Sequence, residues 1–349
     1  MPFKKRISQL IAILLLSLPA FAATDNTPLK NGHPERYIVQ KGDTLWDIAE
    51  QFLRDPWLWP EIWYHNPEIH NPHLIYPGDV ISLVYIDGRP RLTVQTGDRA
   101  GETVKLSPRV REESISSAIP TIPLEAIRPF LTESRIVEEG ALDDAPYVLA
   151  SPDARVMSAA NDRIYVRGLS AEPLPSYAIV RKGDAFIDPD TKQVIGREAR
   201  HIGTARTVSS GDPATLMVVS ANREILKGDR VLPPADDIFQ ANFVPKAPSK
   251  PVEGRIIAVL DGVSQIGQFS IVALNRGQEQ GLEVGDVLAV YKVGEVVRDT
   301  IGGRRGETVK LPDERAGELI VFRTFEKMSL GLIMKAAQPM HVLDIVRNP

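Results

Sequence analysis

All four tryptophans of this 349-residue chain lie between residues 46 and 63, and four of its six histidines lie at positions 33, 65, 70 and 73. Large aromatic side chains fill the interior of a small domain, so their confinement predicts a separate compact unit. One hydrophobic core supports at most roughly 250–300 residues. The sequence therefore predicts several domains, of which one is rich in tryptophan.

The composition excludes several classes of protein. The chain has no cysteine, which removes disulfides, zinc–thiolate sites, thiol nucleophiles and cysteine lipid anchors. Its apolar fraction of 43% is close to that of globular proteins, so disorder of the whole chain is not expected. A formal charge of −4 argues against nucleic acid as the main partner.

The N-terminus has the features of an export signal. The cations Lys4–Arg6 precede the apolar stretch Ile7–Leu18 and a small-residue cleavage site. This order predicts a signal peptide over residues 1–22, cut after Ala22. A retained membrane anchor is the alternative, but the uncharged run is barely long enough to span a bilayer and Pro19 breaks it. We therefore expect a periplasmic protein with no transmembrane segment after signal removal.

Hydrophobic spacing in residues 36–84 predicts the element order β-α-α-β. An alternating segment before Thr44 predicts a first strand, and Thr44 with Asp47 fits a capping box. Apolar residues then follow at the i, i+3, i+4 and i+7 positions of a helix, namely Leu45, Ile48, Ala49 and Phe52. The Asp-Pro pair at 55–56 predicts a second helix start, and residues 80–84 predict a closing strand.

The motifs of this unit resemble those of LysM domains. They read Tyr37-x-Val39-x-x-Gly42-Asp43-Thr44-Leu45-x-x-Ile48-Ala49, then Trp59-x-x-Ile62-x-x-x-Asn66, then Ile75-x-Pro77-Gly78-x-x-Ile81-x-Leu83. The resemblance covers about 50 of the 349 residues. It implies a βααβ fold that binds N-acetylglucosamine-containing glycans, chiefly peptidoglycan or chitin, and it implies no cofactor.

By this resemblance, the sugar groove lies between two loops, over residues 42–46 and 73–77. Backbone groups of these loops are expected to meet the N-acetyl amides, while apolar side chains face the sugar rings. The expected glycan-binding residues are Gly42, Asp43, Thr44, Leu45, Trp46, His73, Leu74, Ile75, Tyr76 and Pro77. A shallow groove with few contacts predicts weak binding, roughly millimolar to micromolar for one domain.

Several residues of the unit also have a purely structural interpretation. Leu45 follows the helical apolar stripe, and Trp59 is better explained as core than as a ligand contact, because a small domain needs large side chains inside. Trp46 and Trp57 remain open between the two roles, since each lies beside a helix start. Gly42 fits a turn as well as a ligand contact, and both roles can coincide.

The rest of the chain predicts mainly-β modules. Residues 86–160 form a connecting region with short strands and a helix near 124–131, and three further parts follow: β-module 1 at 161–234, a proline-rich linker at 235–252 and β-module 2 at 253–349. In both modules, a strand, a long hairpin, two strands and a closing strand follow one another. This order predicts tandem small antiparallel barrels or sandwiches. Chance similarity of generic β sequence is the alternative.

The sequence shows no catalytic constellation. Only His201 and His341 follow residue 85, and neither G-x-S-x-G nor S-x-x-K occurs. The recurring Gly-Asp pairs predict turns rather than catalytic acids. Three histidines of the N-terminal unit lie in a segment interrupted by proline, which favours a polar loop over a metal site: His65, His70 and His73.

We therefore expect a non-catalytic peptidoglycan-binding protein of the bacterial envelope, whose β-modules contact an envelope protein. The layout is similar to that of LysM-containing exported proteins of Gram-negative bacteria. A wall hydrolase with a site near His201 or His341 is one alternative. A structural subunit is another, because Gly281–Tyr291 and Glu318–Phe322 are similar to β-modules of envelope and flagellar-assembly accessory proteins.

Overall fold

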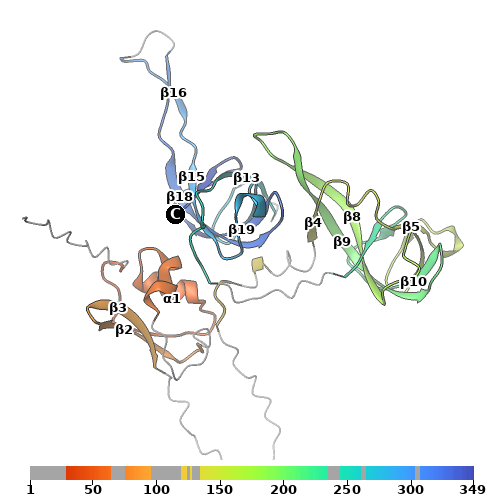
Figure 1. Ribbon diagram of the computed structural model, residues 1–349, viewed down its shortest axis with the longest axis horizontal. Coiled ribbons are helices and arrows are strands. Elements are labelled where there is room, and N and C mark those ends of the chain that lie inside the picture. The colour runs from red at the N-terminus through yellow and green to blue at the C-terminus, as the bar shows by residue number, and fades with distance from the viewer. Residues whose placement is uncertain are drawn as a thin grey trace, which may run out of the picture.

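The computed structural model describes eight segments of the chain: 29–63, 75–95, 119–123, 126–127, 134–234, 244–260, 265–302 and 307–349. Figure 1 shows three compact bodies, which we call the N-terminal unit (orange), the first barrel (green) and the second barrel (blue). The helix expected near 124–131 lies largely outside the described residues, as do residues 235–243 of the predicted linker.

The N-terminal unit has the expected βααβ order with one added strand. Its elements are β1 (Arg36–Ile38), α1 (Leu45–Phe52), the 3₁₀ turn η1 (Pro56–Leu58), α2 (Trp59–Ile62), β2 (Val80–Ile86) and β3 (Arg89–Gln95). The sheet is antiparallel in the order β1-β2-β3. Strand β3 returns through Asp87 and Gly88, whose φ angles are 49° and 73°. Positive φ at both central positions is the requirement of the tight hairpin turn that Asp-Gly pairs favour.

The predicted capping box of α1 is confirmed. The Thr44 hydroxyl accepts from the Asp47 N–H at 3.2 Å, and the Asp47 carboxylate accepts from the Thr44 N–H at 3.0 Å. The buried face of α1 then packs into a core that also holds Trp59 and Ile62 of α2. Trp59 is 3% exposed, so its structural interpretation is confirmed.

The first barrel closes on itself. Its wall consists of β5 (Tyr147–Ala150), β7 (Arg163–Arg167), β8 (Ser176–Ile187), β9 (Val194–Ser209), β10 (Ala214–Ala221) and β12 (Arg230–Leu232). The pairing order is β5-β7-β10-β9-β8-β12, and β12 pairs again with β5. Strand β4 (Ser134–Val137) lies outside this ring on β9, and the short strands β6 (Met157–Ser158) and β11 (Ile225–Leu226) pair with each other. The turn η2 (Pro152–Ala154) follows β5.

The second barrel is also a closed ring. Its strands are β13 (Glu253–Val259), β14 (Ile271–Leu274), β15 (Val287–Lys292), β18 (Glu314–Thr324), β19 (Ser329–Ala336) and β20 (Ile345–Arg347), with the turn η3 (Gln278–Gln280) after β14. The pairing order is β13-β14-β19-β18-β15-β20. A two-stranded arm of β16 (Val296–Arg298) and β17 (Thr308–Lys310) projects from it (Figure 1).

The two barrels have the same connectivity. Replacing β5, β7, β8, β9, β10 and β12 in order by β13, β14, β15, β18, β19 and β20 converts one ring order into the other. The fold class predicted from the sequence, a small βααβ unit followed by tandem antiparallel barrels, is confirmed. In both barrels the third and fourth strands form the long hairpin. Closure removes the free strand edges that an open sheet would leave.

Most of the Gly-Asp pairs that the structure describes are turns, as predicted. The carboxylates of Asp79, Asp229 and Asp286 are at most 4% exposed, and each accepts from the backbone N–H three residues earlier, at 2.8–2.9 Å. Asp344 repeats the arrangement at 2.8 Å. At Gly183–Asp184 the turn prediction is wrong, because the pair lies within strand β8. The pair at 97–98 lies outside the described residues.

Alternate residues of the second barrel belong to two different clusters. Val272, Leu274, Leu288, Leu319 and Val321 are among those that pack in the barrel interior. Their neighbours point outward and form a second cluster, which we call the outer apolar face: Ile271, Ala273, Val287, Ile320, Phe322, Leu330, Leu332 and Met334. Strands that are apolar on both sides must be covered on both sides. The outer apolar face is therefore a docking surface within the chain.

Two other parts of the molecule cover this face. The β8–β9 hairpin of the first barrel contributes Phe186, and the N-terminal unit contributes Trp46. A polar contact secures the hairpin, since the Asn275 side-chain amide donates to the Asp188 carboxylate at 2.7 Å. The N-terminal unit and both barrels therefore meet around one apolar cluster.

Candidate functional site

The two predicted groove loops flank the start of helix α1. The loop over residues 42–46 leads from β1 into α1, and the loop over 73–77 leads into β2; its His73 and Leu74 lie outside the described residues. Backbone bonds of 2.8 Å from Gly78 to Val39 and 2.9 Å from Val39 to Asp79 join the loop bases. These bonds hold the bases of the two loops together.

Asp43 and Tyr76 are held by local hydrogen bonds. The Asp43 carboxylate accepts from the Gln40 N–H at 2.8 Å and from the Tyr37 hydroxyl at 2.9 Å. Burial and this hydrogen bond raise the pKa of Tyr37. The Tyr76 N–H donates to the Asp79 carboxylate at 2.9 Å. Asp43 thus orders the first loop.

Four of the eight predicted site residues that the structure describes are buried. Thr44, Leu45, Trp46 and Ile75 are between 1% and 3% exposed. Asp43, Tyr76 and Pro77 are partly exposed, and Gly42 is exposed. A groove that accepts a sugar needs open backbone groups, so the cover over these residues decides what the site can do.

The cover is a segment of the same chain, Ile119–Ile122. The Leu45 N–H donates to the Pro120 carbonyl at 2.9 Å, and the Trp46 N–H donates to the Thr121 carbonyl at 3.2 Å. On the other side, the Ile119 N–H donates to the Ile75 carbonyl at 2.8 Å. The segment therefore bridges both groove loops through backbone hydrogen bonds.

These bonds satisfy the free end of helix α1. The first turn of a helix has N–H groups without an intrahelical acceptor. The side chain of Thr44 accepts from Asp47, and the carbonyl groups of Pro120 and Thr121 accept from Leu45 and Trp46. The same donors are available to an amide carbonyl of a ligand only when the segment leaves.

Trp46 and Trp57, which the sequence left open, lie at the contact with the second barrel. Trp46 is 2% exposed and belongs to the cluster of the outer apolar face, while the partly buried Trp57 packs against it. Ile122 joins the same cluster and is fully buried. The indole of Trp46 thus serves contact within the molecule here.

Sequence reasoning missed the segment Ile119–Ile122, although a local signal exists. The run Ile119-Pro120-Thr121-Ile122-Pro123 has two isoleucines that each precede a proline. A residue before proline avoids the helical region, and proline itself has no N–H to satisfy. The run is therefore biased away from helix and carries apolar side chains, but nothing local indicates where it docks.

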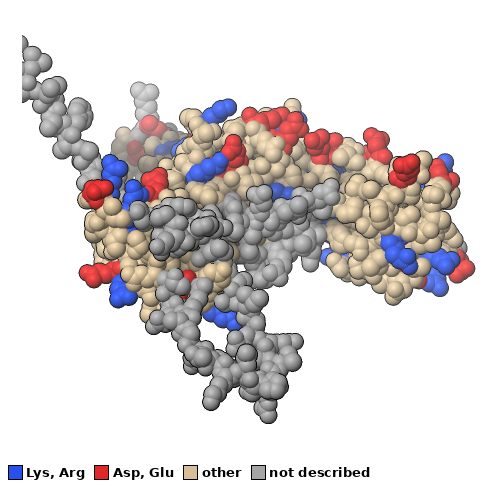
Figure 2. Space-filling model, turned by 60° about the horizontal axis from the view of Figure 1, so that its bottom comes forward, with Lys and Arg blue, Asp and Glu red and all other residues tan. Residues whose placement is uncertain are grey.

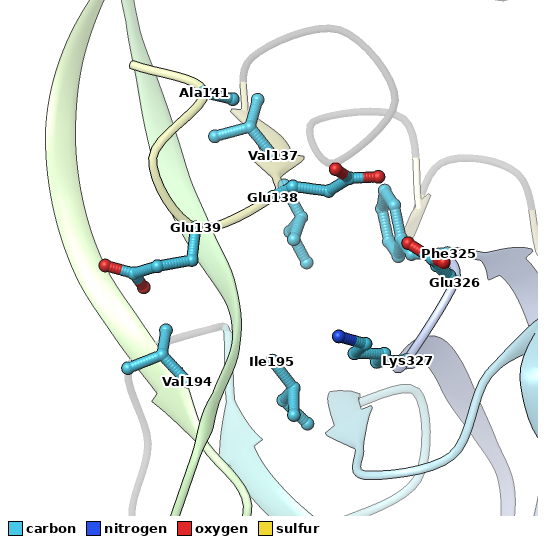
Figure 3. A pocket seen from close by; sticks show the side chains of 10 residues that line it. Val137, Glu138, Glu139, Ala141, Val194, Ile195, Phe325, Glu326 and Lys327 are labelled. Atoms are coloured by element: carbon cyan, nitrogen blue, oxygen red, sulfur yellow. The ribbon is translucent and has the colours of Figure 1, made fainter. Parts of the chain in front are cut away.

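A pocket lies between the two barrels (Figure 3). It measures about 480 Å³, and its wall includes the apolar side chains of Val137, Ile195 and Phe325 with Glu326 and Lys327 beside them. None of the described residues that line it is a serine, threonine, cysteine or histidine. Its ionisable side chains are those of Glu138, Glu139, Glu326 and Lys327.

The two histidines of the hydrolase alternative lie in different barrels. His201 lies on β9 opposite Val180, whereas His341 is exposed in the turn before β20. The Asp344 carboxylate accepts from the backbone N–H of His341 at 2.8 Å. Within the described residues, no group of histidine, aspartate and glutamate side chains could hold a metal ion.

Two buried carboxyl groups of the second barrel have raised pKa values. Burial raises the pKa of Asp286, whose carboxylate also caps the turn at Glu283. Burial likewise raises the pKa of Glu318, and an ion pair of 2.9 Å with Arg315 acts in the opposite direction. Both groups sit in the barrel wall, so their shifts reflect packing.

The described residues on the face drawn in Figure 2 form no continuous basic patch. Figure 2 shows acidic and basic side chains interspersed over one face of the molecule, with several acidic groups along its upper edge. Anionic polymers favour a continuous basic surface. No helix within the described segments is both long and apolar enough to cross a membrane.

Comparison with known proteins identifies the N-terminal unit. Residues 37–84 match the LysM domain family, and the chain is therefore a LysM-domain protein. It is 38% identical over 60 residues to the uncharacterized protein YqbP of Bacillus subtilis (strain 168). That alignment covers 14% of this chain, and the chain spans 27% of the length of the relative. LysM domains bind peptidoglycan or chitin, so the match supports glycan binding.

Proposed function

We propose that this protein is a non-catalytic peptidoglycan-binding protein of the bacterial envelope, which docks its two barrels at the cell wall. The observation that carries the proposal is the LysM domain at residues 37–84, with its two groove loops joined at their bases. Backbone amides there suit the N-acetyl groups of the glycan, since an amide carbonyl accepts from a backbone N–H. The proposed binding residues are those predicted in the two loops.

The absence of a catalytic role is part of the proposal. The described residues place the two histidines of the hydrolase alternative in separate barrels, which supports a binding function. The export signal at residues 1–22 supports a periplasmic location, where peptidoglycan lies within reach.

The second barrel supplies a surface for a proposed envelope protein partner. Side chains of the β16–β17 arm and its tip are exposed, including Val296 at 66% and Ile301 at 99%. An isolated two-stranded hairpin is marginally stable in water, so contact with another protein would stabilise it. Crosslinking in cells, followed by mass spectrometry, tests this part: loss of the crosslinked partner is expected when the arm is removed.

Sedimentation with purified peptidoglycan sacculi tests the main proposal. The mature chain should sediment with the sacculi, and excess N-acetylglucosamine hexamer should release it. Maltohexaose is the matched control, because it is a hexasaccharide without N-acetyl groups and should release nothing. Sedimentation that maltohexaose abolishes equally, or no sedimentation at all, would refute glycan docking. Release of soluble wall fragments by the protein would refute the non-catalytic assignment.

A further inference from the structure

The segment Ile119–Ile122 lies where the proposed glycan would bind. It bonds to Leu45 and Trp46 on one loop and to Ile75 on the other. All three residues belong to the predicted glycan-binding set. A backbone N–H makes one strong hydrogen bond, so the segment and an N-acetyl carbonyl cannot both use these donors.

Side chains of the segment are anchored on both sides. Ile119 is 5% exposed and packs into the core of the LysM domain, whereas the fully buried Ile122 packs against the outer apolar face of the second barrel. The segment therefore lies between the LysM domain and the second barrel and packs against both.

Two features disfavour the contact between the LysM domain and the second barrel. The buried Thr121 hydroxyl has no hydrogen-bond partner among the described residues. Glu318 of the barrel lies close enough to Asp55 and Glu50 of the LysM domain for their charges to repel. An unsatisfied buried hydroxyl and like charges at one contact both weaken it.

We propose that residues 119–122 are a built-in competitor that closes the LysM groove, so that glycan binds only when this segment is displaced. The inference rests on the proposed function, since it assumes that the groove takes glycan. In the closed state the groove is blocked and Trp46 is packed on the barrel. In the open state the amides of Leu45 and Trp46 become available to the N-acetyl groups.

The apparent dissociation constant equals the intrinsic one divided by the fraction of molecules with an open groove. Release of the segment in the full chain should therefore strengthen binding of N-acetylglucosamine hexamer. If fewer than about a tenth of the wild-type molecules have an open groove, the dissociation constant should fall by about tenfold or more. Two variants release it: I122D, and replacement of residues 119–122 by Gly-Ser-Gly-Ser. The matched control is I301D, which adds the same charge at a residue that is 99% exposed and should leave affinity unchanged.

Calorimetric titration of the mature full-length variants separates the outcomes. Tighter binding by both released variants, with I301D like wild type, supports the built-in competitor. Equal affinity of all variants overturns it and leaves the proposed function intact. Failure of every folded variant to bind at millimolar hexamer refutes the proposed function itself.

Amide hydrogen exchange in the wild-type chain provides a test that does not depend on how the variants fold. The Ile119 N–H, which donates to the Ile75 carbonyl at 2.8 Å, should be protected without ligand and should exchange faster at saturating hexamer. Unchanged protection of this amide while the hexamer is bound would overturn the proposal, because glycan and segment would then occupy the domain together.

Discussion

The backbone N–H of Trp46 donates to the carbonyl oxygen of Thr121 at 3.2 Å. The two residues are 75 positions apart in the chain, and their contact joins the LysM helix start to a segment that the second barrel also holds. The start of helix α1 is thereby connected, through residues 119–122, to the second barrel.

Helix α1 depends on its capping box. T44A removes the hydroxyl that accepts from the Asp47 N–H, and it should lower the stability of the LysM domain by about 1 kcal/mol. Urea unfolding followed by tryptophan emission measures this domain specifically, because all four tryptophans lie within residues 46–63. T44S keeps the hydroxyl and should lose much less; an equal loss would contradict the capping role.

The first barrel depends on an ion pair whose carboxylate is buried. The Asp229 carboxylate, in a side chain 4% exposed, accepts from Arg181 at 2.7 and 2.9 Å and from the Leu226 N–H at 2.8 Å. D229A leaves these donors without their acceptor, so it should destabilise the barrel by about 3 kcal/mol. Thermal unfolding followed by circular dichroism measures the loss.

The control for this prediction is D184A in the same barrel. Asp184 also follows a glycine, but it is exposed on strand β8. Its substitution should change the free energy of unfolding by no more than about 0.5 kcal/mol. Similar losses for the two variants would show that the buried turn is not the cause.

Glu318 makes stability depend on pH. Burial raises its pKa in the folded state, so the folded protein binds this proton more tightly than the unfolded chain does. Stability therefore falls as pH rises from the unfolded-state pKa, about 4.3, through the raised folded-state pKa. E318Q cannot ionise and should be more stable than wild type by about 1 kcal/mol at neutral pH, with no advantage at pH values below about 4.

Unfolding curves at several pH values measure this gain, and E283Q provides a control of opposite sign. The hydrogen bond from Lys246 lowers the pKa of Glu283, so the stability from that pair is present at neutral pH and is lost on acidification. E283Q should therefore be neutral or slightly destabilising at neutral pH. An advantage of E318Q that persists at low pH would rule out ionisation as its cause.

The β16–β17 arm should be dispensable for the stability of the second barrel. Its two strands pair with each other and lie outside the closed ring. Replacement of residues 296–310 by a short Gly-Ser turn should change the free energy of unfolding by less than about 1 kcal/mol, because few buried contacts are lost. Thermal unfolding checks this expectation; loss of cooperative unfolding would mean that the arm belongs to the barrel fold.

Local pattern was sufficient to predict the elements of the LysM domain. Each of these elements depends on residues a few positions apart. Examples are the capping box at Thr44, the apolar spacing of α1 and the alternation of side chains along the closing strand. The hairpin to β3 was overlooked although Asp87–Gly88 is a strong signal for it. The signal for this hairpin lies in two adjacent residues, so it can be found from the sequence alone.

The repeated order of strands was also visible in the sequence, since it follows from where apolar runs and turns occur. Closure of each ring could not be predicted from the sequence. The pairing of β12 with β5, and that of β20 with β13, joins residues that are distant in the chain. The apolar runs at Ile271–Leu274 and Leu319–Phe322 indicate strands buried on both faces, but they do not identify what covers the outer one.

The sequence by itself predicted a LysM-type domain and two modules of β-structure, and it placed the expected glycan-binding residues in two loops. Only the tertiary structure decided that Trp46 packs against a barrel and that residues 119–122 form hydrogen bonds with both loops. The physical reason is that helix caps and the alternation of side chains along a strand depend on neighbouring residues. An apolar face, in contrast, can be buried by any surface of complementary shape. Which surface covers it depends on how the whole chain packs.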